Sequence, residues 1–268
     1  NLPEFEQDME RVKNALLAYA WDEESGYFGY AVQGQDGVHI LRTEAGENYN
    51  KGVDGVTPLI AGICSKEQEK QLLKHLKSPE ELWSPVGIST VDMSASYYYD
   101  NGYWNGSVWC PYQYFLWKAM LDIGEGQFAF DIAHRGLNSW KQEIEFSYNT
   151  FEMIQIETER GGWFHQFSGL STPISIWYNA YYKRGTLTTG YDTWIEKKEI
   201  SEDVDHAEII YSTTGTHTGV LLIVMNSLYH YNVEIDGKKA EFIEREKGVI
   251  EITLNRKEGV IIIYRDEK

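Results

Sequence analysis

The spacing of apolar residues constrains the fold of this chain more than any other feature, because it changes near residue 186. Up to about residue 184, apolar side chains recur every three or four positions, as in Phe5, Met9 and Val12, which predicts helices with one buried face. We expect such helices over 3–19, 65–76, 108–121, 128–144 and 172–181. Long segments rich in Gly, Tyr and Trp join them, and segments of that length in a compact domain are usually functional.

After Thr186 the apolar spacing becomes two-fold. Asp236-Gly237 is a strong hairpin signal, and short β-branched runs occur at 207–212, 218–226, 229–235, 249–254 and 260–264. The sequence therefore predicts a mainly α chain in two domains. A helical domain covers 1–186, and a small antiparallel β-sandwich covers 187–268.

Charge excludes several classes of partner. The chain has 24 basic and 41 acidic side chains, a formal net charge of −17, whereas a phosphate backbone or an anionic membrane surface attracts a basic surplus. We therefore expect neither nucleic acid nor a membrane as a partner. The two cysteines leave the compartment open. The chain begins at Asn1 without an initiator Met or a signal peptide, which we interpret as a processed product or an excised fragment.

Aromatic residues are the candidates for binding a ligand. The chain contains 9 Trp, 19 Tyr and 10 Phe beside its many carboxylates, and carbohydrates offer C–H faces to rings and hydroxyls to carboxylates. Four candidate sugar-binding residues lie in a turn that leads into a helix: Tyr103, Trp104, Asn105 and Trp109. An aromatic corner that merely packs against helices is the structural alternative.

A second segment, from Phe151 to Ser171, brings carboxylates into a Gly-rich loop. Glu152 is flanked by Phe151 and Met153, so it can sit in a water-poor wall and act as a general base. Glu157 and Glu159 precede Arg160 and glycines and fit a solvated turn instead. Further candidates for lining the site follow in the same loop: Trp163, His165 and Gln166.

Other chemistries lack their motifs. The sequence contains no phosphate-binding loop, dinucleotide fingerprint, zinc-ligand spacing or Gly-x-Ser-x-Gly, and the adjacent Asp22, Glu23 and Glu24 would not converge on a metal. We therefore expect no cofactor and no metal. Residues 48–59 and 83–90 are Gly/Pro-punctuated segments that are candidates for lining a cleft.

Five segments taken in order resemble glycoside hydrolase family 63, the processing α-glucosidase type, and its trehalase-like relatives. The segments are 21–28, 55–62, 87–90, 103–109 and 152–171, and the resemblance covers 3–184. It implies an (α/α)6 toroid that hydrolyses α-linked glucosides or mannosides of an oligosaccharide with inversion and without a cofactor. It also makes Glu152 the general base and Trp104 and Trp109 sugar-lining rings. Asn105 stands where the family commonly has Arg, which weakens any charge-assisted bond to the substrate.

The length of the chain does not fit a whole toroid. Twelve helices need upward of about 300 residues at ordinary lengths, and in the family the general acid is an Asp that precedes the motif starting here at Trp21. We expect this chain to be the C-terminal half of the toroid, completed by an upstream segment or another chain that holds the acid. If the chain is complete, Glu47, Asp92 and Asp100 are the fallback acids.

Two other functions stay open on the sequence alone. The chain could be a carbohydrate-binding or scaffold protein that has the toroid wall without catalysis. It could also be a different (α/α)-barrel enzyme, a sugar epimerase or a polysaccharide lyase, for which His165 is the candidate base.

Overall fold

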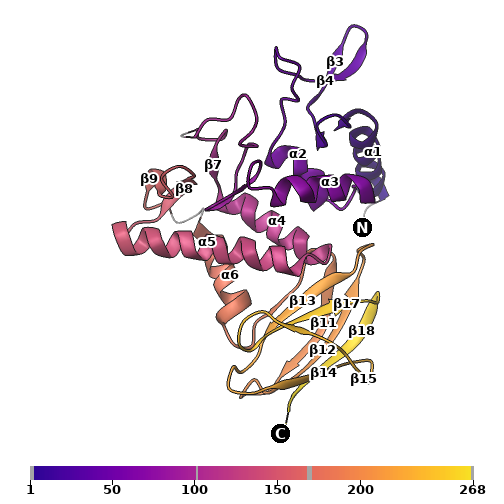
Figure 1. Ribbon diagram of the computed structural model, residues 1–268. Coiled ribbons are helices and arrows are strands. Elements are labelled where there is room, and N and C mark those ends of the chain that lie inside the picture. The colour runs from indigo at the N-terminus through magenta and orange to yellow at the C-terminus, as the bar shows by residue number, and fades with distance from the viewer. Residues whose placement is uncertain (1–2, 101, 168–170, 267–268) are drawn as a thin grey trace. The chain divides into compact units, whose positions relative to one another are not determined.

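The computed structural model describes residues 3–100, 102–167 and 171–266 (Figure 1). Over these residues the chain forms six helices, with small sheets between them, and then antiparallel sheets at the C-terminus. The chain divides into two compact units. The first comprises Asn1–Tyr112 and Glu143–Phe167, and the second comprises Gln113–Gln142 and Ser168–Lys268.

The first unit contains helices α1 (Pro3–Tyr19), α2 (Val53–Ile60) and α3 (Lys66–Lys77). The predicted capping box is present at the start of α3, where the Ser65 hydroxyl accepts from the Gln68 N–H and the Gln68 side chain accepts from the Ser65 N–H. In α1 no residue is buried, and the apolar stripe that includes Phe5, Met9 and Val12 is more than half exposed.

Four small antiparallel sheets complete the first unit. They consist of β1 (Trp21–Asp22) with β2 (Tyr27–Phe28), β3 (Ala31–Gly34) with β4 (Gly37–Ile40), β5 (Trp83–Ser84) with β6 (Gly87–Ile88), and β7 (Ser107–Val108) with β8 (Phe151–Gln155) and β9 (Gly161–His165). The last sheet joins two segments more than 40 positions apart in the sequence, because Val108 pairs with Ile154. It therefore brings the two predicted sugar-site segments together.

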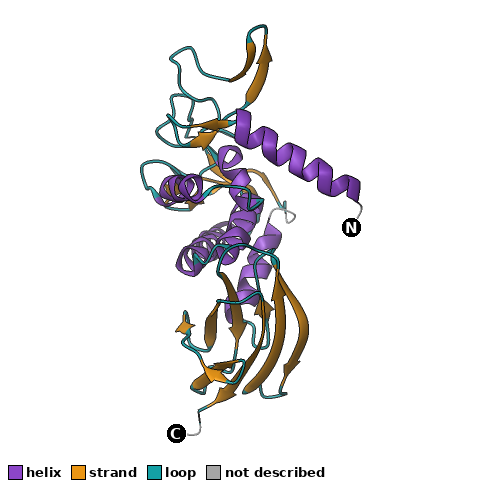
Figure 2. Ribbon diagram, turned by 90° about the vertical axis from the view of Figure 1, so that its right-hand side faces the viewer, coloured by secondary structure: helices purple, strands orange, loops and turns teal. Residues whose placement is uncertain are grey.

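Two larger antiparallel sheets form the C-terminal part of the second unit (Figure 2). One has the order β10 (Leu187–Thr188), β13 (Gly219–Val224), β17 (Val249–Leu254), β16 (Ile243–Glu244), and the other β11 (Thr193–Ile200), β12 (His206–Thr213), β18 (Glu258–Arg265), β14 (Tyr231–Ile235), β15 (Lys238–Lys239). Alternate residues of both sheets, such as Ile209, Leu221 and Ile263, meet in one apolar cluster. Burial of these faces is the main source of stability here.

Three helices belong wholly or partly to the second unit: α4 (Cys110–Asp122), α5 (Gly126–Ser147) and α6 (Thr172–Tyr182). Lys118 of α4 donates to the carbonyls of Thr189 and Gly190, and the Asp122 carboxylate accepts from the N–H groups of Tyr191 and Asp192 at 2.6 and 2.9 Å. These bonds tie α4 to the chain that enters β11.

The structure departs from the predicted elements at a few places. The helix expected from residue 108 begins at Cys110, because Val108 pairs into the β7–β8–β9 sheet. Helix α2 was expected to be a connecting segment, since it contains Gly55 and Pro58. The remaining predicted helices are confirmed within a few residues. A division into domains at residue 186 stays a prediction.

Candidate functional site

The β8 strand positions Glu152 next to the aromatic turn. A β-bulge lies between Phe151 and Met153, and bulges re-aim a side chain relative to the regular alternation of a strand. The Glu152 side chain is 9% exposed. Its Oε1 accepts a hydrogen bond from the Tyr103 hydroxyl. Its Oε2 is buried and has no hydrogen-bond partner among the residues that the structure describes.

Comparison with other buried carboxylates sets Glu152 apart. In the described part of the chain the buried carboxylates are Asp22, Asp92, Glu143, Glu152 and Glu251. All but Glu152 have an Arg or Lys nitrogen within 3.4 Å. Glu152 instead receives its hydrogen bond from a neutral phenol. A carboxylate in contact with a cation is a weak base, whereas one with a vacant acceptor position can bind a water or a substrate hydroxyl and take up its proton.

Three tryptophan rings contact the ring of Tyr103. The Tyr103 ring meets Trp104, Trp109 and Trp163 edge-on, with centroid distances of 5.6, 4.8 and 4.9 Å. Trp104 stacks on Trp109 at 3.8 Å, and it remains 52% exposed while Trp109 is 2% exposed. Trp109 therefore supports the cluster from within, and Trp104 and the exposed Trp163 present the open faces.

Backbone contacts shape the turn that carries Tyr103 and Trp104. The Asn105 carbonyl accepts from the Tyr99 N–H, and the Asn105 side chain donates to the Tyr97 carbonyl. A Cβ at Gly106 would lie 1.8 Å from the Tyr99 carbonyl oxygen, so only glycine fits there. Asn105 thus holds the loop. The structure gives it no contact with Glu152.

The hairpin of β8 and β9 is anchored by an ion pair that sequence reasoning missed. Glu143, near the end of α5, accepts from Arg160 Nε at 2.8 Å and Nη2 at 3.0 Å, and from the Gly161 N–H at 2.9 Å. These hydrogen bonds, those of Arg160 first, lower the pKa of Glu143 to about 2. A helical Glu paired with an Arg 17 positions later follows no local sequence pattern, so no signal in the sequence could have revealed the pair.

The remaining candidate residues of the 151–171 segment are exposed. His165 and Gln166 are exposed at the end of β9, and His165 lies beside Phe151 with a ring distance of 6.5 Å. Glu157 and Glu159 lie exposed in the turn after β8, as expected.

Each of the three fallback acids either accepts hydrogen bonds from neighbouring residues or is exposed. Asp92 is completely buried and accepts from the Tyr27 hydroxyl and from Ser94. Although burial opposes it, hydrogen bonds from Ser96 and Lys51 lower the pKa of Glu47, which is the wrong direction for a general acid. Asp100 is exposed.

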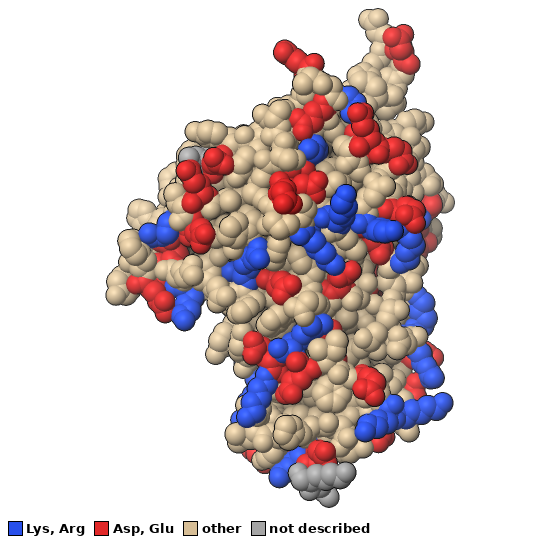
Figure 3. Space-filling view, in the orientation of Figure 1, with Lys and Arg blue, Asp and Glu red and all other residues tan. Residues whose placement is uncertain are grey.

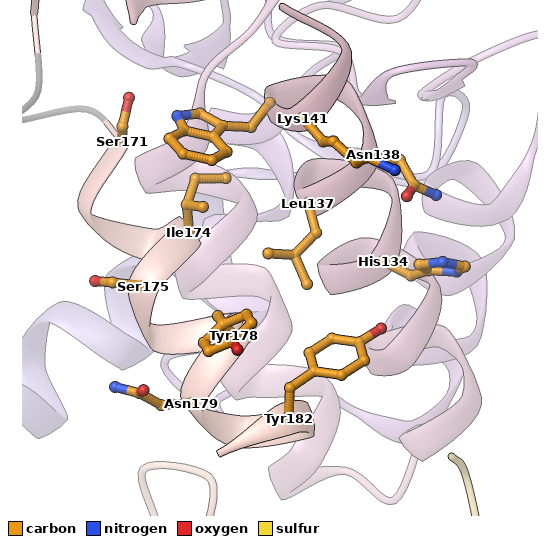
Figure 4. Close-up of a pocket in the computed structure, with 11 residues that line it drawn as sticks. His134, Leu137, Asn138, Lys141, Ser171, Ile174, Ser175, Tyr178, Asn179 and Tyr182 are labelled. Atoms are coloured by element: carbon orange, nitrogen blue, oxygen red, sulfur yellow. The ribbon is translucent and has the colours of Figure 1, made fainter. Parts of the chain in front are cut away.

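Among the cavities bordered by the described residues, two are relevant to a ligand site. In the first unit, residues 49–54 with Thr90 and Val91 line a pocket of about 260 Å³ together with Trp104, which agrees with the expectation that these segments border a cleft. In the second unit, α5 and α6 border a groove of about 580 Å³ that His134, Leu137, Tyr178 and Tyr182 help to line (Figure 4). None of the described residues lining the groove is Asp or Glu, so it offers no carboxylate for the acid–base pair of a glycosidase.

The described residues offer neither a metal-ligand cluster nor a membrane-spanning helix. Within 3–100, 102–167 and 171–266, no three His, Cys, Asp or Glu side chains gather as a metal ion would require. Across the same residues, every helix is too short or too polar to cross a membrane. On the face in Figure 3, Lys and Arg are interspersed with Asp and Glu.

Known proteins are similar to this chain in structure and in sequence. A GH63 mannosylglycerate hydrolase from Thermus thermophilus, solved with glucose, is similar at a TM-score of 0.53 and 21% identity, over 67% of this chain and 41% of that one. Neutral trehalase Nth1 from Saccharomyces cerevisiae gives a TM-score of 0.47 at 16% identity, over 65% of this chain and 30% of that one.

A curated relative is similar at the sequence level. A probable mannosyl-oligosaccharide glucosidase of Schizosaccharomyces pombe is 28% identical over 105 residues, 37% of this chain and 12% of that protein. The chain thus spans about two fifths of the solved mannosylglycerate hydrolase and about an eighth of the glucosidase. Residues 2–152, more than half of the chain, match the mannosylglycerate hydrolase MGH1-like glycoside hydrolase domain, and the chain therefore belongs to that family.

Proposed function

We propose that this chain supplies the general base of an inverting α-glycoside hydrolase, and that Glu152 is that base. The observation that carries the proposal is the environment of its carboxylate. Among the described residues, the buried Glu152 has neither an ion-pair partner nor a hydrogen-bond partner for its Oε2. An acceptor of this kind, in a wall of aromatic rings, suits a water that must lose a proton.

The reaction follows from inversion. Glu152 Oε2 takes a proton from a water molecule, and the water oxygen forms a bond to the anomeric carbon. The bond from that carbon to the glycosidic oxygen breaks, and the leaving oxygen receives a proton from a second carboxylic acid. The two carboxyl groups must be about 6.5–9.5 Å apart to leave room for the water. We propose that the second acid, an Asp, lies upstream of residue 1, in the segment or chain that completes the toroid.

The remaining residues either position Glu152 or contact the substrate. The Tyr103 hydroxyl holds Oε1 of Glu152, which leaves Oε2 for the water. The exposed faces of Trp104 and Trp163 would stack on an α-linked glucoside or mannoside unit of an oligosaccharide. Asn105, His165 and Gln166 are proposed as further polar contacts at the rim.

We also propose that this chain is the C-terminal half of an (α/α)6 toroid, which further helices complete. The apolar stripe of α1, with Phe5, Met9 and Val12 more than half exposed, has the character of a face that another helix covers. The solved relative, of which this chain spans 41%, is long enough to contain such helices. An upstream segment of the same protein is the proposed occupant.

The test uses the full-length protein with Glu152→Gln, which keeps the shape of the side chain and removes its basicity. Turnover of a synthetic α-glucoside or α-mannoside should fall by about 10²–10⁴-fold, the usual contribution of a general base. Proton NMR of the wild-type reaction should show the β-anomer first. Glu157→Gln, the same chemical change at an exposed position of the adjacent turn, should leave turnover unchanged.

Two results would reject the proposal. Near-normal turnover by Glu152→Gln would remove Glu152 from the mechanism. Saturable glycan binding by a wild-type protein that never releases reducing sugar would favour the carbohydrate-binding alternative, for which the exposed rings of Trp104 and Trp163 would be sufficient.

A further inference from the structure

The 260 Å³ pocket of the first unit takes no part in the proposed chemistry of Glu152. Its wall contains five aromatic rings: Tyr30, Tyr49, Tyr97, Trp104 and Tyr112. Trp104 belongs both to this pocket and to the cluster around Tyr103 and Glu152. The pocket therefore adjoins the candidate catalytic residues through a shared ring, and a molecule that spans Trp104 would reach both.

Asp54 gives the pocket an acceptor for hydroxyl groups. It lies in the first turn of α2 and is exposed. Its Oδ2 accepts from the Tyr30 hydroxyl at 3.0 Å, and its Oδ1 accepts from the Tyr112 hydroxyl at a longer 3.4 Å. Burial first, and then Asp54 itself, raise the pKa of Tyr30 to about 12, so that phenol remains a donor at neutral pH. A carboxylate offers about four acceptor positions, and the two phenols use two of them.

In the described lining of the pocket, no cation is available to neutralise the charge of Asp54. Lys51 and Asp54 are the charged residues among those described in its lining. The Lys51 ammonium contacts the carboxylates of Glu47 at 3.1 Å and Asp92 at 3.4 Å, so its charge is already matched. An anionic ligand would meet the Asp54 carboxylate without a compensating cation, whereas a neutral ligand would find acceptors and stacking faces.

We propose that this pocket binds an uncharged, hydroxyl-rich unit of the substrate, a sugar or polyol, and that Asp54 selects it against an anionic unit such as glycerate. The inference rests on the proposed glycosidase function for the identity of the substrate class. Hydroxyls of the ligand donate to the free lone pairs of Asp54, and Trp104 supplies a stacking face. Asp54 is thus a specificity-determining residue.

The test compares two ligands that differ at one carbon, α-glucosylglycerol and α-glucosylglycerate. Their dissociation constants are measured by titration calorimetry on the full-length protein carrying Glu152→Gln, so that hydrolysis does not interfere. We expect the neutral ligand to bind about tenfold more tightly, which equals about 1.4 kcal/mol. Repulsion between two partly exposed carboxylates is large enough for this ratio and should weaken as salt is added.

The variant Asp54→Asn should reduce the tenfold ratio to about twofold or less, because the amide keeps the shape and removes the charge. Asp36→Asn is the matched control, since it makes the same charge change at the exposed turn between β3 and β4 and should leave the ratio at about ten. Circular dichroism checks that both variants are folded.

Three outcomes would overturn the inference: a ratio that Asp54→Asn does not change, tighter binding of the glycerate ligand, or no saturable binding of either one. Failure of the proposed hydrolysis is recognised separately, by comparing the turnover of the wild-type protein with that of Glu152→Gln. If turnover fails to depend on Glu152 while the ratio still depends on Asp54, the pocket assignment stands and the catalytic one falls.

Discussion

Glu143→Gln tests whether the ion pair that anchors the β8–β9 hairpin stabilises the fold. The carboxylate of Glu143 accepts two hydrogen bonds from Arg160 and one from the Gly161 N–H. The amide in the variant retains one acceptor oxygen and loses the charge. The first unit should therefore unfold more easily at neutral pH, and the loss should depend on pH.

The magnitude follows from the pKa of Glu143, which falls from an ordinary 4.5 to about 2 in the folded chain. That difference corresponds to about 3.4 kcal/mol. The Arg160 side chain is 38% exposed, so solvent screens the pair and we expect about 1–2 kcal/mol at pH 7. Because the folded pKa is depressed, the contribution is complete above pH 4.5 and is lost as pH falls through 2. At pH 3 about two fifths should remain.

Urea unfolding at pH 7 and pH 3 measures the effect. The free energy of unfolding of the wild type should exceed that of Glu143→Gln by about 1–2 kcal/mol at pH 7 and by less than half of that at pH 3. Glu157→Gln, in the exposed turn of the same hairpin, should unfold like the wild type at both values. A difference between wild type and Glu143→Gln that does not change with pH would refute the assignment of the stabilisation to the ionised pair.

Two further substitutions probe the turn beside Glu152. Tyr103→Phe removes the donor to Glu152 Oε1, so turnover should fall about tenfold with a small change in KM, consistent with a lost bond of about 1.5 kcal/mol to a charged group; unchanged kcat would contradict a positioning role. Gly106→Ala would place a Cβ 1.8 Å from the Tyr99 carbonyl, and the melting temperature should drop by several degrees, on the order of a 1–3 kcal/mol loss. An unaltered melting temperature would show that the loop can move aside.

Elements with local determinants were predictable from the sequence. The start of α3 follows from the side chains of Ser65 and Gln68, and the β14–β15 turn follows from Asp236-Gly237, both of which adopt positive φ. The strand β11 was not predicted, because Glu196, Lys197 and Lys198 mask its alternation. It lies at the edge of its sheet, where charged residues are tolerated.

The sequence singled out candidate site residues, whose roles stay predictions, but it gave no geometry for them. Phe151 and Met153 marked Glu152 as a carboxylate with apolar neighbours, and Glu152 is buried in the structure. The bond from Tyr103 to Glu152 depends on the pairing of β7 with β8, whose residues are more than 40 positions apart. Such pairing is set by tertiary register and leaves no local pattern. For the same reason Asp54 was not singled out within the 48–59 segment.

Two buried glutamates, Glu143 of α5 and Glu152 of β8, have environments of opposite energetic sign. Glu143 is matched by Arg160, which favours folding by about 1–2 kcal/mol. Glu152 places an oxygen in the interior without a partner among the described residues, which costs about 1–3 kcal/mol. The two free energies are similar in size, so the Glu143–Arg160 ion pair offsets the cost of burying the Glu152 carboxylate. Stability alone would favour a Leu or a paired Glu at position 152. The unmatched carboxylate there is therefore consistent with a ligand that completes its hydrogen bonds.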